Sequence, residues 1–261
     1  MNIVVCIKQV PDTTEVRVDP ETNALVREGV KSITNPFDEN AIEAALQLRE
    51  QHGGKVTVIT MGPGQAESAL RDAIAMGADE AILISDAAFR GSDTLATSYV
   101  LAQAVRKIGA FDLILCGKQA IDGDTAQVGP GLAERLGIPQ VTFAIELSVE
   151  NGKLRARRVL ESGFEVVEVK PPALVTVVKQ INEPRYPGMK GVLRARKAPI
   201  VRWDAAAIGT DPRFAGFDGS PTWVVRVFPP ERRAKGERIQ ADAETAAKRL
   251  AEVIEGMHLS P

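Results

Sequence analysis

The residues best suited to binding chemistry lie between Gly117 and Pro130, where the sequence reads GKQAIDGDTAQVGP. This stretch follows an apolar run, DLILC, and leads into GLAERLG, which has a helical pattern. Small polar residues at such a place leave backbone N–H groups at a helix N-terminus, which favours an anion such as phosphate. Gly117 and Gly123 would let the backbone approach a ligand closely, and Thr125 can donate a hydroxyl proton to phosphate.

Two features of this loop leave its interpretation open. The common phosphate motifs GxxxxGK[ST] and GxGxxG are both absent from it. Its carboxylates, Asp122 and Asp124, are awkward beside phosphate, and they could instead face a ribose or cap backbone amides. From these residues alone, a nucleotide site and a capped turn without a ligand are equally good interpretations.

Two further loops contain candidate residues. In TNPFDENA, residues 34–41, Pro36 restricts Asn35 to extended backbone, and the Asn35 amide could contact a ring or a phosphate. The alternative is a helix start that Asp38 caps. In TMGPGQAES, Met61 could lie beside a flat ring, or the segment could simply turn.

Catalytic side chains are not evident in the sequence. The two histidines, His52 and His258, lie far apart, and the two cysteines, Cys6 and Cys116, sit in apolar runs without CxxC spacing. We therefore expect reduced thiols near strand ends, no zinc site and no Ser-His-Asp machinery. Nucleotide-like loops without an acid, a base or a nucleophile fit a bound redox cofactor whose own ring does the chemistry.

The elements that position these loops alternate regularly up to about residue 137. Apolar runs predict strands at 2–7, 55–62, 80–85 and 111–117, and amphipathic segments predict helices at 37–54, 64–79, 92–109 and 126–137, the third with Ser92 as N-cap. This pattern predicts an α/β fold with a doubly wound, mostly parallel sheet, Rossmann-like and of the adenine-nucleotide-binding type. Ligands of such sheets bind at the carboxyl ends of strands, after residues 7, 61, 85 and 116.

The pattern changes after residue 140. Alternating residues and the turn signal Asn151-Gly152 predict an antiparallel hairpin at about 140–170, and residues 173–178 should return to the main sheet. Residues 182–240 are rich in Pro, Gly and Arg and predict irregular structure, either an arm on a partner or a loop on the chain's own domain. An amphipathic helix should follow at 241–257. We expect a nucleotide- or flavin-binding domain over 1–185, and a partner-recognition loop and C-terminal arm over 186–261.

Composition excludes some functions. The 261 residues are 25% charged and 44% hydrophobic with a net charge of −2, which is typical of a soluble globular protein and does not favour nucleic acid as a partner. No apolar run approaches the ~20 residues of a membrane span. The start, MNIVVCIKQVPD, lacks the architecture of a signal peptide, so we expect a cytoplasmic protein.

Several segments together resemble the beta subunit of electron-transfer flavoproteins. They are, in order, KQVPDT, NPFDENAIEAAL, MGPGQAE, AMGADEA, GKQAIDGDTAQVGP and NEPRYP, and the resemblance extends from residue 1 to about 200. The family's P-x-L-V-T strand corresponds to Pro172–Thr176, whereas RRVLESGFE departs slightly at Ser162. The resemblance implies a heterodimer with an alpha subunit that carries FAD.

The resemblance also implies a nucleotide in this chain. Ordinary members hold AMP there, and electron-bifurcating members hold a second FAD, the type that VPDT and DGDTAQVGP resemble. The bifurcating chemistry would take hydride from NADH, send one electron to ferredoxin or flavodoxin, and send the other through the alpha-subunit FAD to an acyl-CoA dehydrogenase or quinone reductase. The alternative is an ordinary carrier from acyl-CoA dehydrogenases to a quinone oxidoreductase. A non-redox adenine-nucleotide-binding module is more remote, and a nucleotide-dependent ligase or hydrolase lacks the residues it would need.

Site residues follow from the resemblance position by position. The implied cofactor contacts are Cys6, Asn35, Pro36, Phe37, Asp38, Met61, Gly117, Lys118, Gln119, Ala120, Ile121, Asp122, Gly123, Asp124, Thr125, Ala126, Gln127 and Val128. In EPRYPGMKGVLRARKAPI, Met189 matches an apolar anchor for the dehydrogenase. The basic residues around it, which could steer an acidic partner, are Arg185, Lys190, Arg194, Arg196 and Lys197. Without the resemblance, this segment would be interpreted as a solvated basic loop.

Overall fold

The computed structural model describes residues 1–12, 32–225, 236 and 238–256. The chain divides into two compact units, residues 1–226 and residues 227–261. The second unit contains helix α6 (Ala243–Gly256), which confirms the predicted terminal helix. The functional division expected at residue 185 stays a prediction.

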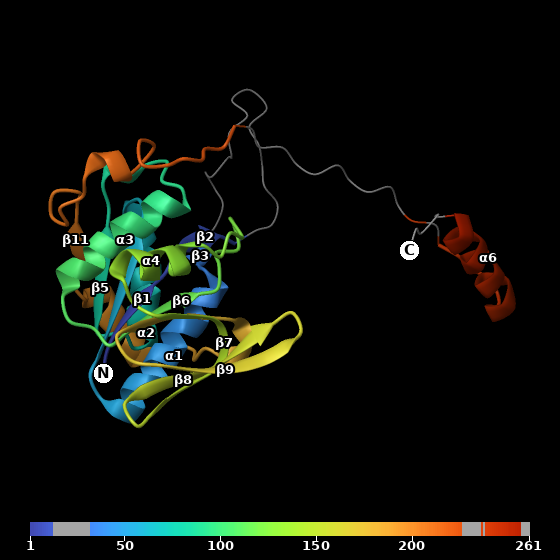
Figure 1. Ribbon diagram of the computed structural model, residues 1–261, viewed down its shortest axis with the longest axis horizontal. Helices are drawn as coiled ribbons and strands as arrows, with labels where there is room; N and C mark the ends of the chain where they lie inside the picture. Colours follow the sequence, from blue (N-terminus) through green and yellow to red (C-terminus); the bar gives the residue numbers. More distant parts are fainter. Residues whose placement is uncertain (13–31, 226–235, 237, 257–261) are drawn as a thin grey trace. The chain divides into compact units, whose positions relative to one another are not determined.

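The first unit is built on a nine-stranded sheet (Figure 1). Its order is β11 (Val201–Trp203), β5 (Glu80–Ile84), β4 (Lys55–Met61), β1 (Asn2–Cys6), β6 (Leu113–Gly117), β10 (Ala173–Val177), β7 (Gln140–Glu150), β8 (Lys153–Leu160) and β9 (Gly163–Val169). Neighbouring strands from β11 to β7 pair in parallel, and β7, β8 and β9 pair antiparallel. The predicted α/β class, the mostly parallel sheet and the antiparallel extension are confirmed.

Helices cover both faces of the parallel part, as a doubly wound sheet requires. Helices α1 (Pro36–His52) and α2 (Glu67–Met76) bury Leu46 and Leu70 in the core of one face. Helices α3 (Thr94–Ile108) and α4 (Val128–Leu136) bury Val100 and Leu132 in the core of the other. The remaining elements are short: β2 (Gln9–Pro11), β3 (Ser32–Thr34), α5 (Met189–Lys197) and the 3-10 turns η1 (Gly64–Ala66), η2 (Ala87–Phe89), η3 (Lys179–Ile181) and η4 (Pro212–Phe214).

The expectation of irregular structure after residue 182 is wrong in two places. Helix α5 packs on α2, where Arg194 donates hydrogen bonds to the carbonyl oxygens of Ile74 and Ala78. A side chain at Gly191 would meet the carbonyl oxygen of Ala75 at 2.2 Å, so glycine permits this close packing. Strand β11 adds to the free edge of β5. Both elements take their shape from a neighbour, which explains why their own sequence pattern is weak.

Strand order creates a crevice between β1 and β6. The chain runs from β1 to β4 and β5 on one side and then returns to β6 on the other side of β1. The loops that leave β1 and β6 therefore diverge, one toward each face of the sheet. Open α/β sheets bind ligands at such a switch point, outside the carboxyl ends of the strands.

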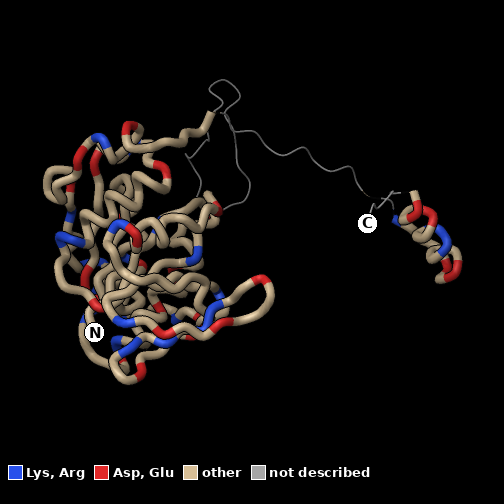
Figure 2. Tube along the Cα trace, viewed as in Figure 1, with Lys and Arg blue, Asp and Glu red and all other residues tan. Residues whose placement is uncertain are grey.

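The antiparallel extension projects beyond the layered part of the first unit (Figure 1). Basic and acidic residues alternate along it (Figure 2), and ion pairs join Arg157 to Glu146 at 2.9 Å and Lys153 to Glu168 at 3.2 Å. The extension therefore presents both signs of charge. Among the described residues, none of the helices has the length and apolar character needed to cross a bilayer.

Candidate functional site

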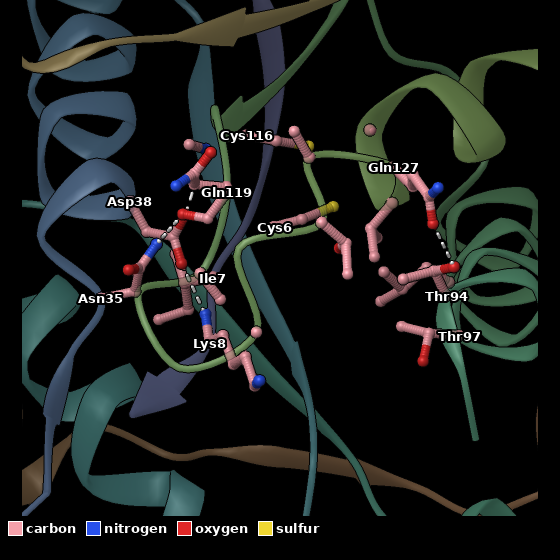
Figure 3. A pocket seen from close by; sticks show the side chains of 18 of the residues that line it. Cys6, Ile7, Lys8, Asn35, Asp38, Thr94, Thr97, Cys116, Gln119 and Gln127 are labelled. Atoms are coloured by element: carbon pink, nitrogen blue, oxygen red, sulfur yellow. Dashed lines mark hydrogen bonds between the residues drawn. The ribbon is translucent and has the colours of Figure 1, made fainter. Parts of the chain in front are cut away.

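A cavity of about 350 Å³ lies at the carboxyl ends of β1 and β6, between the starts of α3 and α4 (Figure 3). Its volume falls within the range of roughly 300–1,000 Å³ that is typical of small-molecule sites. It occupies the switch point that the strand order creates. The cavity lies at the carboxyl ends of the strands, the edge at which a ligand was expected, and the binding of a ligand there stays a prediction.

Most of the predicted cofactor residues line this cavity. They are Cys6, Asn35, Asp38, Met61, Gly117, Lys118, Gln119, Ala120, Gly123, Thr125, Ala126, Gln127 and Val128. The predicted residues that do not line it are Pro36, Phe37, Ile121, Asp122 and Asp124. The tertiary structure thus brings together residues from four separate loops.

The sequence prediction omitted several residues that line the cavity, most of them at the start of α3. The missed lining residues are Ile7, Lys8, Ser92, Asp93, Thr94, Thr97, Leu101, Cys116 and Gly129. The predicted topology places the loop after residue 85 at the same edge of the sheet. The side chains that line the cavity, however, come after the η2 turn, at the start of α3. Thr94 and Thr97 are three residues apart on one helix face, and this spacing was the available signal.

The start of α4 presents unpaired backbone N–H groups to the cavity. Within the described part of the chain, no acceptor contacts the N–H groups of residues 125–129, and Gln127, at the N-cap, makes no side-chain cap. Asp124 and Ala126 have φ values of 50° and 53°, and Gln127 then takes φ −100° and ψ −23°. A left-handed residue followed by a right-handed one turns successive N–H groups to the same side, which makes a concave anion site. This geometry suits a phosphate.

Helix α3 begins differently from α4. The Asp93 carboxylate accepts hydrogen bonds from the N–H groups of Leu95 and Ala96, so this helix start is already capped. The prediction that Ser92 is the N-cap is wrong, because its hydroxyl bonds to the carbonyl of Phe89 instead. A phosphate at this end of the cavity would therefore meet α4 rather than α3.

Asp38 ties the ends of β1 and β6 together. Its carboxylate accepts the N–H of Lys8 at 2.7 Å and the N–H of Gly117 at 3.0 Å. Burial raises the pKa of Asp38 to about 7, although these two N–H groups and the side chain of Asn35 oppose that shift. The alternative of Asp38 as a helix cap is wrong, because α1 begins at Pro36 with Asn35 at the N-cap.

Asn35 holds the 117–129 loop from the other side. Its amide donates to the carbonyl of Gln119 at 2.8 Å (Figure 3) and accepts the N–H of Ile121 at 3.2 Å. Asn35 is 1% exposed, so its polar atoms are committed to this loop. Its amide shapes the site rather than offering free donors to a ligand.

Both carboxylates of the loop are turned toward protein partners. Asp122 forms an ion pair with Lys8 at 2.7 Å, and Asp124 accepts a hydrogen bond from the Gln119 amide at 2.6 Å. Neither residue lines the cavity. The difficulty of placing two carboxylates beside a phosphate is thereby removed.

The glycines of the loop serve different purposes. A Cβ at Gly117 would lie 2.4 Å from Oδ1 of Asp38 and 2.6 Å from Cβ of Phe37, so Gly117 admits helix α1 rather than a ligand. A Cβ at Gly129 would lie 2.6 Å from Cγ2 of Thr176, so Gly129 lets α4 pack on β10. A Cβ at Gly123 would meet nothing within 4 Å.

A hydrogen bond connects the two helix starts across the cavity. The Thr94 hydroxyl donates to Oε1 of Gln127 at 2.9 Å (Figure 3). Thr97 lies one turn further along α3 and also lines the cavity. These hydroxyls place polar groups opposite the thiols of Cys6 and Cys116.

The predicted partner-binding residues fall into two groups. Arg185 bonds to Glu43 at 2.7 Å and also pairs with Glu50, and Arg194 bonds to α2, so both guanidinium groups are engaged within the chain. Met189 is 76% exposed on α5. Within the described residues, the side chains of Lys190, Arg196 and Lys197 make no hydrogen bond or ion pair.

Comparison with known proteins identifies the family. Residues 22–208 match the model of the electron transfer flavoprotein domain. The electron transfer flavoprotein subunit beta of Thermoanaerobacterium thermosaccharolyticum is 51% identical over 99% of this chain and 100% of its own length. The corresponding subunit of Megasphaera elsdenii is 48% identical, covering 98% and 97% of the two chains. The caffeyl-CoA reductase-Etf complex subunit CarD of Acetobacterium woodii is 50% identical, covering 92% of each. The chain therefore belongs to the electron transfer flavoprotein family, among its beta subunits.

Proposed function

We propose that the cavity holds the adenosine phosphate part of an FAD and that this chain is the beta subunit of an electron-bifurcating flavoprotein. The unpaired N–H groups of residues 125–129 support the nucleotide part of this proposal, because unpaired N–H groups at the uncapped start of α4 suit a phosphate. The cavity volume of about 350 Å³ suits an adenosine phosphate.

The chain's own residues would bind and orient the cofactor. The N–H groups of residues 125–129 would hold phosphate oxygens, and the hydroxyl of Thr97 would face the same space. Met61 and Leu101 provide an apolar wall for a flat ring. When bound, the flavin supplies the exchange between two-electron and one-electron transfer, which the side chains lack.

The proposal includes partners that the family suggests. An alpha subunit with its own FAD would complete a heterodimer, NADH would supply hydride, and ferredoxin or flavodoxin would take one electron. An acyl-CoA dehydrogenase or a quinone reductase would receive the other electron, and the similarity to CarD, a subunit of a caffeyl-CoA reductase-Etf complex, supports an acyl-CoA-type acceptor. A cytoplasmic location belongs to the same proposal.

The exposed face of α5 would contact the acceptor enzyme. Met189 is accompanied by Leu193, which is 51% exposed one turn further along, and by Tyr186, which is 95% exposed. Apolar and aromatic side chains of this kind anchor interfaces, whereas rim charges mainly steer the approach. Lys190 would take that steering role.

The second candidate is an ordinary carrier with a structural AMP in the same cavity, and the small cavity favours it. The two functions are separated by the cofactor content of the heterodimer. We expect two flavins per dimer when the chain is co-expressed with its alpha subunit, purified, denatured and analysed for released flavin and nucleotide. One FAD and one AMP per dimer would exclude bifurcation, and the absence of both flavin and AMP from this chain would exclude the nucleotide site.

A further inference from the structure

Two thiols lie side by side where the sheet meets the cavity. Cys6 and Cys116 are register partners in the parallel pair of β1 and β6. Both belong to the core of the face that α3 and α4 cover, and both line the cavity. Two residues earlier in the same strands, the register partners are the apolar residues Val4 and Ile114. The two cysteines therefore replace an apolar pair at the floor of the cavity.

The thiols share one direction and one environment. In Figure 3 both sulfur atoms lie on the side of the strands that faces Thr94, Thr97 and Gln127. They are 7% and 6% exposed, and both are free. The neighbouring Cys6 thiol and burial raise the pKa of the Cys116 thiol. A buried thiol with a raised pKa, as at Cys116, is a poor nucleophile, but the two sulfur atoms remain a pair of soft ligands once a metal displaces the protons.

We propose that Cys6 and Cys116 form a two-coordinate site for a soft monovalent metal ion of the copper(I) and silver(I) class. Neighbouring strands lie about 4.8 Å apart, and two metal–thiolate bonds of roughly 2.3 Å in a line span about 4.6 Å. A disulfide fits less well, because it needs Cβ atoms about 3.8 Å apart, whereas the Cα–Cβ bonds of parallel partners point the same way. Binding forms two metal–sulfur bonds and releases two thiol protons, leaving a unit with one negative charge.

The metal and the proposed nucleotide would compete for the same space. The thiols are reached through the cavity, and the metal unit would place negative charge near the N–H groups proposed to hold phosphate. The cofactor-free chain is therefore the form that binds the metal. This competition depends on the proposed nucleotide site, whereas the metal site itself depends only on the thiol pair.

The test is a titration of the full-length, nucleotide-free chain with silver(I) in chloride-free buffer, following bound silver and released protons. The chain has two cysteines in all, so no other thiol contributes. We expect one silver ion per chain and two protons per ion. Cys6→Ser and Cys116→Ser should each weaken binding at least 100-fold. Two silver ions per chain, one proton per ion, or unchanged affinity in either variant would overturn the site.

A second experiment uses competition by adenosine monophosphate and needs no variant of the protein. Saturating the wild-type chain with this nucleotide should weaken silver binding at least tenfold. If the nucleotide binds, as measured separately, without weakening silver binding, the shared cavity is refuted. If the nucleotide fails to bind while the stoichiometry and proton release hold, the metal site stands and the proposed function fails.

Discussion

The 117–129 loop and the 182–197 segment make opposite use of their polar groups. Both contain glycine and charged residues, and both resemble binding segments of the family. The first leaves its backbone N–H groups unpaired toward a cavity. In the 182–197 segment, two arginines form hydrogen bonds with other parts of the same chain, and apolar side chains are exposed.

This difference shows how to separate a ligand site from a structural contact. Buried polar groups require partners, so a group left without one in a cavity is available to a ligand. An arginine whose guanidinium group already pairs with two carboxylates has few N–H donors left for a partner protein. By this criterion the proposed phosphate site lies at the start of α4, and the proposed partner surface depends on Met189, Leu193 and Tyr186 rather than on Arg185.

Removing Arg185 gives the largest expected effect. In Arg185→Ala, the Glu43 carboxylate, whose side chain is 5% exposed, loses its charged partner, and the free energy of unfolding should fall by about 3 kcal/mol. Glu50→Gln is the matched control, because the Glu50 side chain is 48% exposed and should contribute at most about 1 kcal/mol. Denaturant unfolding measures both. Equal small losses would show that Arg185 is not a structural clamp.

The same ion pair predicts a pH dependence. Burial pushes the pKa of Glu43 upward, but hydrogen bonds from Arg185 outweigh it and hold that pKa below the ordinary value of 4.5. The contribution to stability is therefore complete above about pH 4.5 and is lost as the pH falls through the lower pKa of the folded state. In Arg185→Ala, the free energy of unfolding should no longer show this decrease at acid pH, as measured by unfolding at a series of pH values.

The contrast between Gly117 and Gly123 gives the next effect. Gly117→Ala places a methyl group against Asp38 and Phe37, and it should cost about 1–3 kcal/mol of stability by forcing α1 away from β6. Gly123→Ala lies in open space and should change stability by no more than about 0.5 kcal/mol. If the two variants unfold alike, the packing role of Gly117 is wrong.

Met189 tests the apolar surface of α5. In the heterodimer, Met189→Asp should slow electron delivery to an acyl-CoA dehydrogenase by roughly 30-fold, because an interface anchor contributes about 2 kcal/mol. Lys190→Ala is the control and should change the rate by less than about tenfold, with a weaker dependence on salt because one steering charge is gone. Flavin content should be unaffected in both. A Met189→Asp protein with wild-type transfer rates would remove the anchor role.

The smallest effect is expected from the hydrogen bond across the cavity. Thr94→Val removes the donor to Gln127 and should weaken nucleotide binding by roughly 3- to 10-fold, the worth of about 0.5–1.5 kcal/mol. Thr210→Val removes a hydroxyl that donates to the carbonyl of Ala205, away from the cavity, and should leave affinity unchanged. Calorimetric titration with AMP compares them. Equal affinities would mean that this hydrogen bond does not order the site.

The sequence alone determined the layered fold and the location of the site. Continuous apolar runs such as residues 2–7 and 111–117, alternating with helical segments, favour strands buried on both faces of a parallel sheet, and the carboxyl ends of such strands collect the loops at one edge. These are local properties, because each strand or helix carries its own periodicity. The positions of Cys6, Met61 and the loop after Cys116 at this edge follow from the order of the strands and helices.

Tertiary structure alone decided which polar groups remain available. Asp38 faces the N–H groups of Lys8 and Gly117, and Arg185 faces Glu43 across 142 positions of sequence, so no local pattern could reveal either partner. Helix α5 and strand β11 likewise form against α2 and β5 rather than from their own pattern. Hydrogen bonds between segments distant in sequence depend on the folded arrangement, and they separate a residue that binds a ligand from one that holds the loop in place.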